Sequence, residues 1–279
     1  MMLTILRWII VAILAVGVPL WIYLSVFADE PVFSVENDVE LGQQTARSIQ
    51  EDPQQYPLLS EDDYPEAYRY LRNMVGQIVR SKDVQYADVF AYEEVRIIQD
   101  DNVLNAFCTP GGFVYVYSGL IRYLDAGDHL AGVLGHEIGH AERRHSSLRL
   151  QKEYGTRKLL ELAVWSPAVG LGGVVTAKML TDLTTLKYSR GQEAESDRLS
   201  VHYLADSEYA CDGAAGFFEK LLGEGNDTGI PEIVSDHPDS EARVSDIRNE
   251  AAQLGCSTKL GDQTAWLQFK AGLPPLKQK

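Results

Sequence analysis

The sequence predicts an α+β domain that is mainly helical, with a small antiparallel sheet and one hydrophobic helix at the N-terminus. Apolar residues recur at helical spacing in several segments, most regularly within residues 128–145. Residues 95–99 and 113–117 are instead rich in β-branched and aromatic side chains, which favour strands. Residues 8–27 carry no charged side chain, which sets them apart from the rest of the chain.

A chain of 279 residues is long enough for one large domain with appendages. Apolar side chains make up 45% of it, so it can bury a sizeable core. The formal net charge of -15 repels phosphate backbones, which argues against nucleic acid as a partner. We divide the chain into residues 1–28 as a transmembrane anchor or signal peptide, 29–65 as a linker with the first helix, 66–256 as the main domain and 257–279 as a C-terminal tail.

The uncharged run at residues 8–27 is long enough to cross a hydrocarbon core of about 30 Å as a helix. Arg7 precedes it and Asp29 follows it, so the positive-inside rule leaves the N-terminus in the cytoplasm and sends the remaining chain across the membrane. Two interpretations stay open. An uncleaved run anchors the domain to the outer face of a membrane. A signal peptide with its site at Val26-Phe27-Ala28 leaves the domain secreted or periplasmic.

The other elements follow from similar patterns. Residues 110–112, Pro-Gly-Gly, predict a turn between the two strands, which can then pair as a hairpin. Residues 159–183 are apolar enough to suggest a second span, but Lys178 and Asp182 favour a packed pair of soluble helices. Helices are predicted over residues 39–50, 64–81, 128–145, 192–204, 213–222 and 240–254.

The three cysteines are Cys108, Cys211 and Cys256. Export would make a disulfide chemically possible. Cys211 and Cys256 both lie in the last third of the chain, and we take a bridge between them as a hypothesis, because spacing does not fix connectivity. Cys108 is then expected to be a small buried residue.

Residues 136–140 read His-Glu-Ile-Gly-His, an H-E-x-x-H motif on the most regular predicted helix. Residues four apart share one helix face, so His136 and His140 can bind the same Zn²⁺ ion. Glu137 is placed to reach a water molecule at that ion and to act as general base. His145 would lie about 140° around a continuous helix from His140, so we interpret it as surface or supporting structure and not as a ligand.

A catalytic zinc ion usually has three protein ligands. The third must be a further His downstream or a Glu on a second helix. Residues 189–197 offer Glu193 and Asp197, one helical turn apart. Glu193 can bind the metal while Asp197 accepts a hydrogen bond from the other ring nitrogen of a histidine ligand. Glu195 falls on a different face and is expected to be exposed.

Three further elements accompany these motifs. Residues 189–197 follow the pattern Ser-Arg-x-x-Glu-x-x-x-Asp. Asn105-Ala106-Phe107, Pro110-Gly111-Gly112 and Gly119-Leu120 precede the H-E-x-x-H helix, and Asp236-His237-Pro238 with Arg243 follows. In this order, over roughly residues 39–254, they resemble the HtpX and CAAX-prenyl-protease type of gluzincin, metallopeptidase family forty-eight. The resemblance implies a zincin-like metallopeptidase domain over residues 66–256.

The resemblance also implies roles for individual residues. One zinc ion per chain would be bound by His136, His140 and Glu193, with Glu137 as general base. Asp197 would orient a histidine ligand. His237 and Arg243 carry over as catalytic residues. His237 either donates to the oxyanion or binds zinc in a resting state, and Arg243 either neutralises charge or pins that loop.

The implied function is a zinc-dependent metalloendopeptidase acting outside the cytoplasm on misfolded or unassembled envelope proteins. Because one span is predicted, the chain looks more like the exported, single-domain members of the family. The alternative is a latent zinc-binding module, chaperone-like or regulatory, with little turnover. Implied partners are protein or peptide substrates, and a membrane through the N-terminal helix. A substrate is expected to add a strand along residues 105–117.

Overall fold

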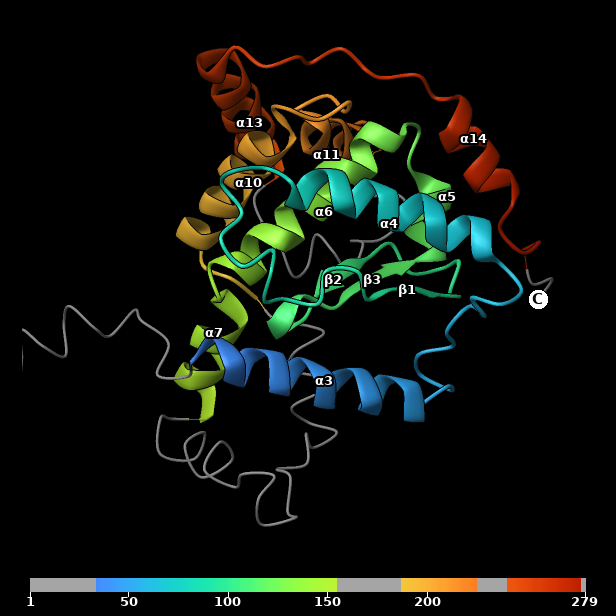
Figure 1. The fold of residues 1–279 in the computed structure, drawn as a ribbon. Coiled ribbons are helices and arrows are strands. Elements are labelled where there is room, and N and C mark those ends of the chain that lie inside the picture. Colours follow the sequence, from blue (N-terminus) through green and yellow to red (C-terminus); the bar gives the residue numbers. More distant parts are fainter. Residues whose placement is uncertain (1–33, 155–186, 225–239, 277–279) are drawn as a thin grey trace, which may run out of the picture. The chain divides into compact units, whose positions relative to one another are not determined.

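The computed structural model describes residues 34–154, 187–224 and 240–276. The hydrophobic run at residues 8–27, the predicted helical pair at residues 159–183 and His237 lie outside these ranges. Within them, no helix has both the length and the apolar character needed to cross a membrane. The structure confirms the predicted class, a mainly helical α+β domain with a small sheet (Figure 1).

Three strands form the sheet in the order β1-β3-β2: β1 (Val95–Ile98), β2 (Ala106–Cys108) and β3 (Val114–Tyr117). β2 and β3 are antiparallel, and the turn between them uses φ angles of 75° and 89° at Gly111 and Gly112, a region that glycine adopts readily. β1 and β3 run parallel, so the predicted hairpin of these two strands is wrong and the sheet is mixed. The prediction missed β2, because a strand of this length is too short to show alternation of polar and apolar residues. β2 lies between β1 and β3 in the sequence and reverses the chain direction, so β1 and β3 run parallel.

Successive side chains of each strand point to opposite faces of the sheet, and both faces are apolar. On one face, α4 (Pro65–Val79) and α6 (Gly127–Glu142) complete the main core, and on the other α3 (Val35–Glu51) covers a smaller cluster (Figure 1). The first face presents Val95, Ile97, Ala106, Cys108, Val114 and Val116. The second presents Ile98, Phe107, Tyr115 and Tyr117, packed with Ile49 of α3.

Helix α6 is the centre of the fold, because it contacts β2, α4, α10 and α11. The predicted helices at residues 39–50, 64–81, 192–204, 213–222 and 240–254 are confirmed to within a few residues. The helices besides α3, α4 and α6 include α5 (Ser118–Tyr123), α7 (His145–Tyr154), α10 (Arg190–Leu204), α11 (Gly213–Glu224), α13 (Ser240–Leu254) and α14 (Thr264–Ala271).

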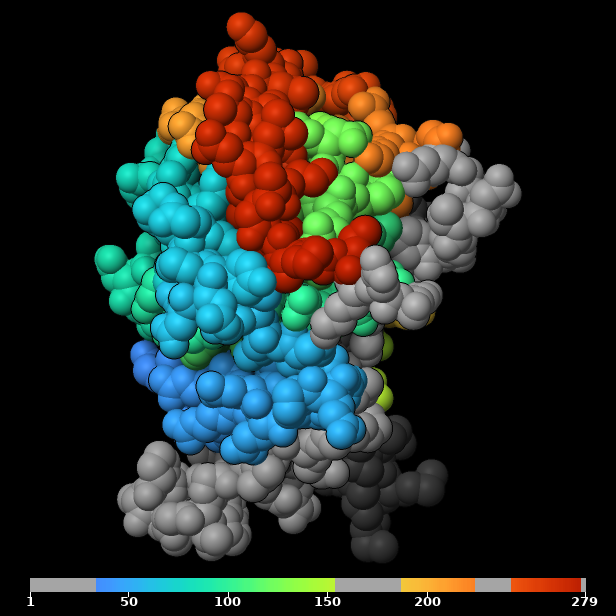
Figure 2. All heavy atoms as spheres, turned by 90° about the vertical axis from the view of Figure 1, so that its right-hand side faces the viewer, coloured from blue at the N-terminus to red at the C-terminus, as the bar shows by residue number. Residues whose placement is uncertain are grey.

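The segment expected as a C-terminal tail contains α14, an ordered helix. Its Trp266 and Phe269 are buried, and the Phe269 ring stacks on Tyr70 of α4 with centroids 4.6 Å apart. Figure 2 shows these C-terminal residues, in red, lying against α4. The described part of this segment is therefore packed on the domain.

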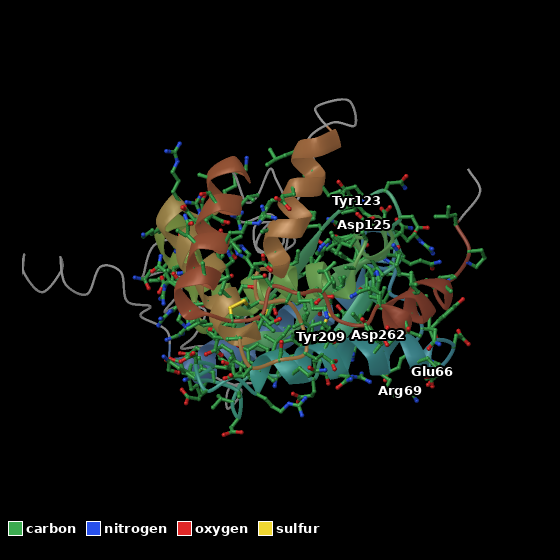
Figure 3. All side chains as sticks on the ribbon, turned by 90° about the horizontal axis from the view of Figure 1, so that it is seen from above. Glu66, Arg69, Tyr123, Asp125, Tyr209 and Asp262 are labelled. Carbon is green, nitrogen blue, oxygen red and sulfur yellow. A yellow bond between two sulfur atoms is a disulfide. The ribbon has the colours of Figure 1, made fainter. Side chains whose placement is uncertain are left out.

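A disulfide joins Cys211, between α10 and α11, to Cys256, just after α13, with Cα atoms 6.2 Å apart (Figure 3). The hypothesis of this pairing is confirmed. Cys108 is a buried free thiol in β2, as predicted. The bridge ties the end of α13 to the segment that leads into α11.

Candidate metal centre

Helices α6 and α10 approach closely because small residues line their contact. A side chain at Gly139 would place its Cβ 3.2 Å from Ser196 Cα, and one at Gly135 would meet the Ser200 hydroxyl at 2.7 Å. Ser200 Oγ also donates to the carbonyl oxygen of Gly132, at 2.7 Å. The glycine inside the H-E-x-x-H motif thus lets the second helix approach the histidines.

Helix α10 begins with a capping box that fixes where its first turn lies. The Ser189 side chain accepts from the backbone N–H of Gln192, and the Gln192 side chain accepts from the backbone N–H of Ser189. Glu193 follows in the first turn and is only 2% exposed. Glu193 and, one turn later, Asp197 are therefore buried beside α6.

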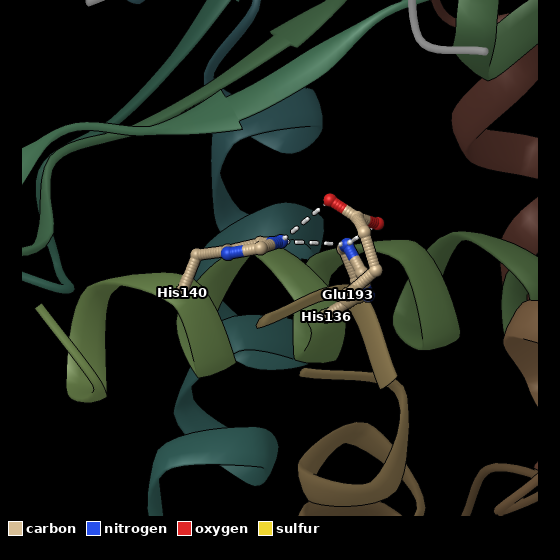
Figure 4. A group of neighbouring side chains, drawn as sticks. All are labelled: His136, His140 and Glu193. Carbon is tan, nitrogen blue, oxygen red and sulfur yellow. Dashed lines mark hydrogen bonds and ion pairs between the residues drawn. The ribbon is translucent and has the colours of Figure 1, made fainter. Parts of the chain in front are cut away.

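Three ligand atoms meet between these helices (Figure 4). Nε2 of His136 and Nε2 of His140 lie 3.0 Å apart, and each lies 3.5 Å from an oxygen of Glu193. All three atoms lie within 4.8 Å of one another. A tetrahedral zinc ion with bonds of about 2.0–2.1 Å holds its ligand atoms about 3.4 Å apart. Two imidazole nitrogens and a carboxylate oxygen at these distances therefore fit a zinc ion in both chemistry and spacing.

The side chain of His136 is supported by charged groups from distant elements. Its Nδ1 lies 2.8 Å from Oδ1 of Asp197. Arg243 of α13 donates to both oxygens of Asp197, at 2.7 and 2.6 Å, and its Nη1 lies 2.9 Å from Glu193. Arg243 is 5% exposed and covers the ring of Phe218 at 4.1 Å. We call this group, formed by Asp197, Arg243 and Glu193, the carboxylate side.

Electrostatics on the carboxylate side favour positive charge at the His136 ring. Burial and Arg243 lower the pKa of His136, but its hydrogen bonds to Asp197 and Glu193 outweigh them and raise that pKa to about 9. Burial opposes ionisation of Asp197, yet Arg243 and His136 together lower the pKa of Asp197. The Asp197 carboxylate stays ionised next to the ring, and a proton or a metal ion can supply the charge that it attracts.

On the side of its ring away from Glu193, His140 contacts neutral groups. Its Nδ1 lies 2.8 Å from Nδ1 of His145, and the ring of Tyr188 stacks on it with centroids 3.8 Å apart. The Tyr188 hydroxyl shares a hydrogen bond of 2.9 Å with Ser146. His145 is 3% exposed, and burial lowers its pKa to about 4 although Glu195 raises it. We call the group formed by His145, Tyr188 and Ser146 the neutral side.

His145 reaches this position because the helix ends earlier than predicted. The predicted helix at residues 128–145 stops at Glu142, and α7 starts at His145. Between them Arg144 has a φ of 55°, which turns the chain, so the angle expected along a continuous helix does not apply. Sequence periodicity gave no signal for this turn. Glu195, expected to be exposed, is half-buried and pairs with Arg143 at 2.8 Å.

The structure brings together six of the seven residues singled out from the sequence. Glu137 is 3% exposed on α6, beside His136, and it lines a small cavity with Phe217, Phe218 and Arg243. His237 lies outside the described residues. Tyr188 and Ser146 also support the centre, and no motif singled them out, whereas His145, interpreted as surface or supporting structure, is supporting.

An H-E-x-x-H helix, a carboxylate from a second helix and a small mixed sheet beside them are the features of a zincin-like metallopeptidase domain. The chain belongs to peptidase family M48, whose family model matches residues 65–251. Members of this family are zinc-dependent metalloproteases, which agrees with the ligand set assembled here.

Individual relatives match parts of the chain. It is 31% identical over 167 residues to the Beta-barrel assembly-enhancing protease of Escherichia coli (strain K12), which covers 57% of this chain and 34% of that protein. It is 29% identical over 205 residues to Metalloprotease LoiP of the same organism, covering 70% and 74%. It is 30% identical over 148 residues to the Mitochondrial metalloendopeptidase OMA1 of Arabidopsis thaliana, covering 53% and 29%. The chain thus spans about a third of the first relative's length.

Proposed function

We propose that this chain is a zinc-dependent metalloendopeptidase that cleaves protein substrates outside the cytoplasm. The observation that supports this best is the buried cluster of His136, His140 and Glu193 with Glu137 on the same helix. In this proposal the three clustered side chains bind one zinc ion. Membership of a metallopeptidase family supports the same assignment.

The other residues of the centre have separate tasks. A bound zinc ion would polarise the scissile carbonyl and lower the pKa of the attacking water. Glu137 takes a proton from that water and gives it to the leaving amine. Asp197 holds His136 with a proton on Nδ1, which leaves Nε2 free to bind. Arg243 offsets the charge of Asp197 and Glu193, and we assign His237 to the oxyanion or to the metal in a resting state, by resemblance to the family.

A substrate chain would bind in an extended conformation beside β2. β2 is a terminal strand of the sheet and packs next to α6, so a strand added there would run past Glu137. This proposal narrows the predicted substrate-binding segment, residues 105–117, to the first part of that segment, which contains β2.

We further propose that the domain works in an envelope or secreted compartment on misfolded or unassembled proteins. The uncharged run at residues 8–27 supports an anchor or a signal peptide. The disulfide between Cys211 and Cys256 supports an oxidising compartment. The name of one relative, Beta-barrel assembly-enhancing protease, agrees with a task in the envelope.

One observation favours a regulated form of the same site. His136, Glu137, His140 and Glu193 expose at most 4% of their surface. Burial this deep favours a centre that is closed to a substrate chain. The latent zinc-binding module therefore stays the second candidate, and it differs from the first in lacking turnover on unfolded protein.

The test uses the full chain, purified in detergent, in three forms: wild type, Glu137→Gln and Glu153→Gln. Zinc per chain is measured by atomic emission, and cleavage is followed with unfolded casein. We expect about one zinc in each form, with cleavage lowered about 10²–10⁴-fold in Glu137→Gln alone. Glu153 is an exposed residue of α7 and serves as the control.

Full activity in Glu137→Gln would exclude Glu137 as the base. Zinc in all three forms with no cleavage in any would favour the latent module, and absence of zinc from wild type would refute the metal centre.

A further inference from the structure

Burial makes the contact between His140 and His145 costly unless both ring nitrogens of His145 are satisfied. His145 is 3% exposed, and its Nδ1 lies 2.8 Å from Nδ1 of His140. Its Nε2 faces Oε2 of Glu195 at 3.5 Å, and Arg143 holds the other oxygen of that carboxylate. The imidazole is thus enclosed between a proposed metal ligand and a carboxylate.

Only one arrangement of protons fits these contacts, given the proposed function. If His140 binds zinc through Nε2, its Nδ1 carries the ring proton and must donate it. Nδ1 of His145 must then accept, so the proton of His145 lies on Nε2 and points to Glu195. In this arrangement His140 donates to His145, and His145 donates to Glu195.

Further contacts fix the geometry of His140, His145 and Glu195. Tyr188 stacks on the face of His140 at an interplanar angle of 19°, which restricts how that ring can tilt. Arg144, whose φ of 55° turns the chain, donates to Asp38 and to the carbonyl oxygen of Ser34. Ser147 donates to the same Asp38, at 2.6 Å. Helix α3 therefore pins the turn that delivers His145 to His140.

We propose that His145 is a positioning residue of the metal centre, which accepts the Nδ1 proton of His140 and is itself oriented by Glu195. It does for His140 what Asp197 does for His136, but as a neutral group. The proposal rests on the proposed function, since it assigns a support to one of the proposed zinc ligands.

The test compares zinc affinity, by competition with a chelator, among variants of the full chain. Asn places its side-chain oxygen where Nδ1 of His145 lies, so His145→Asn keeps the acceptor, whereas His145→Leu removes it. We expect His145→Leu to bind zinc about 10–100-fold more weakly and His145→Asn to stay within about tenfold of wild type. His202→Leu is the matched control, because His202 also pairs with a carboxylate, Glu250 at 2.6 Å, away from the centre.

A spectroscopic measurement separates positioning from general damage. The visible absorption of the Co²⁺-substituted protein reports ligand geometry, and we expect it to change in His145→Leu and to be restored in His145→Asn. Should His145→Leu fail to fold, His145→Gln replaces it, since its amide lies one atom further out. The His145→Asn variant must then bind zinc more tightly than the His145→Gln variant.

Equal zinc affinity in wild type and His145→Leu would overturn the proposal, and so would equal losses in the Asn variant and the Leu or Gln variant. These outcomes differ from a failure of the proposed function, in which wild type itself binds no zinc or leaves casein intact.

Discussion

The carboxylate side and the neutral side support two histidines that lie on the same helix, four residues apart, yet they are built differently. His136 depends on Asp197 of α10 and Arg243 of α13, which are far along the chain. His140 depends on His145, from the next turn of chain, and on the ring of Tyr188. One side uses compensated charge, and the other uses a neutral hydrogen bond and an aromatic ring.

This difference predicts how much stability each side should lose when one of its residues is replaced. Buried charges are costly when one partner is lost, because the remaining charge has no compensation. A neutral hydrogen bond costs less to remove. Substitutions in α13 that remove a charged partner should therefore lower the free energy of unfolding strongly. Substitutions on the neutral side should lower it less.

The largest expected effect comes from Arg243→Met. Methionine keeps an apolar chain over Phe218 but removes the guanidinium that pairs with the buried Asp197 and Glu193. We expect the free energy of unfolding of the chelator-treated full chain to fall by about 3–5 kcal/mol in urea titrations. Arg248→Met on the same helix is the control, because its pair with Glu219 is exposed and should be worth about 0–1 kcal/mol. Equal losses in both variants would show that burial of the pair is not the cause.

The disulfide offers the next test, because the loop that it closes contains α11 and α13 and therefore Arg243. Cys211 and Cys256 are 45 residues apart. Replacing both with Ala should lower the free energy of unfolding by about 2–4 kcal/mol, and reduction of the wild type should do the same. Cys108→Ala controls for loss of a buried sulfur outside the bridge. An unfolding midpoint that does not change on reduction would contradict this expectation.

Asp197→Asn tests the carboxylate side through the metal. The amide keeps an oxygen that can face Nδ1 of His136 but loses the charge that this side supplies. Zinc affinity should fall about 10–100-fold by chelator competition. Glu250→Gln, which makes the same change beside His202, should leave affinity unaltered. An unchanged affinity in Asp197→Asn would mean that orientation alone, without charge, is enough at His136.

Part of this centre follows from sequence and part does not. His136, Glu137 and His140 form a local pattern on a helix with clear periodicity, so spacing alone places them together. Glu193 and Asp197 are candidates because they lie one helical turn apart, but spacing cannot bring this acidic pair to the histidines, and it is the family resemblance that implies their roles there. The close approach itself depends on small residues such as Gly139, whose effect appears only once the two helices are packed.

The missed features depend on contacts between distant segments. The end of α6 is set at Arg144 by Asp38 of α3, which lies 106 residues earlier in the chain. No pattern near His140 reports that contact, so periodicity predicts a continuous helix and leaves His145 as surface or supporting structure. Strand β2 is three residues long, and it is defined by pairing with β3 more than by its own composition. Local patterns predicted the ligands, and long-range contacts determine what supports them.

The smallest expected effect belongs to the neutral side. Tyr188→Phe keeps the ring that stacks on His140 and removes the hydroxyl that bonds to Ser146 at 2.9 Å. We expect the free energy of unfolding to fall by about 0.5–1.5 kcal/mol, with less than a tenfold change in zinc affinity, because the hydrogen bond lost to Ser146 is a neutral one. Ser146→Ala removes the partner of the same bond and should cost a similar amount. A loss of several kcal/mol in Tyr188→Phe would mean that the neutral side is as sensitive as the carboxylate side, and the difference between the two supports would then not arise from charge.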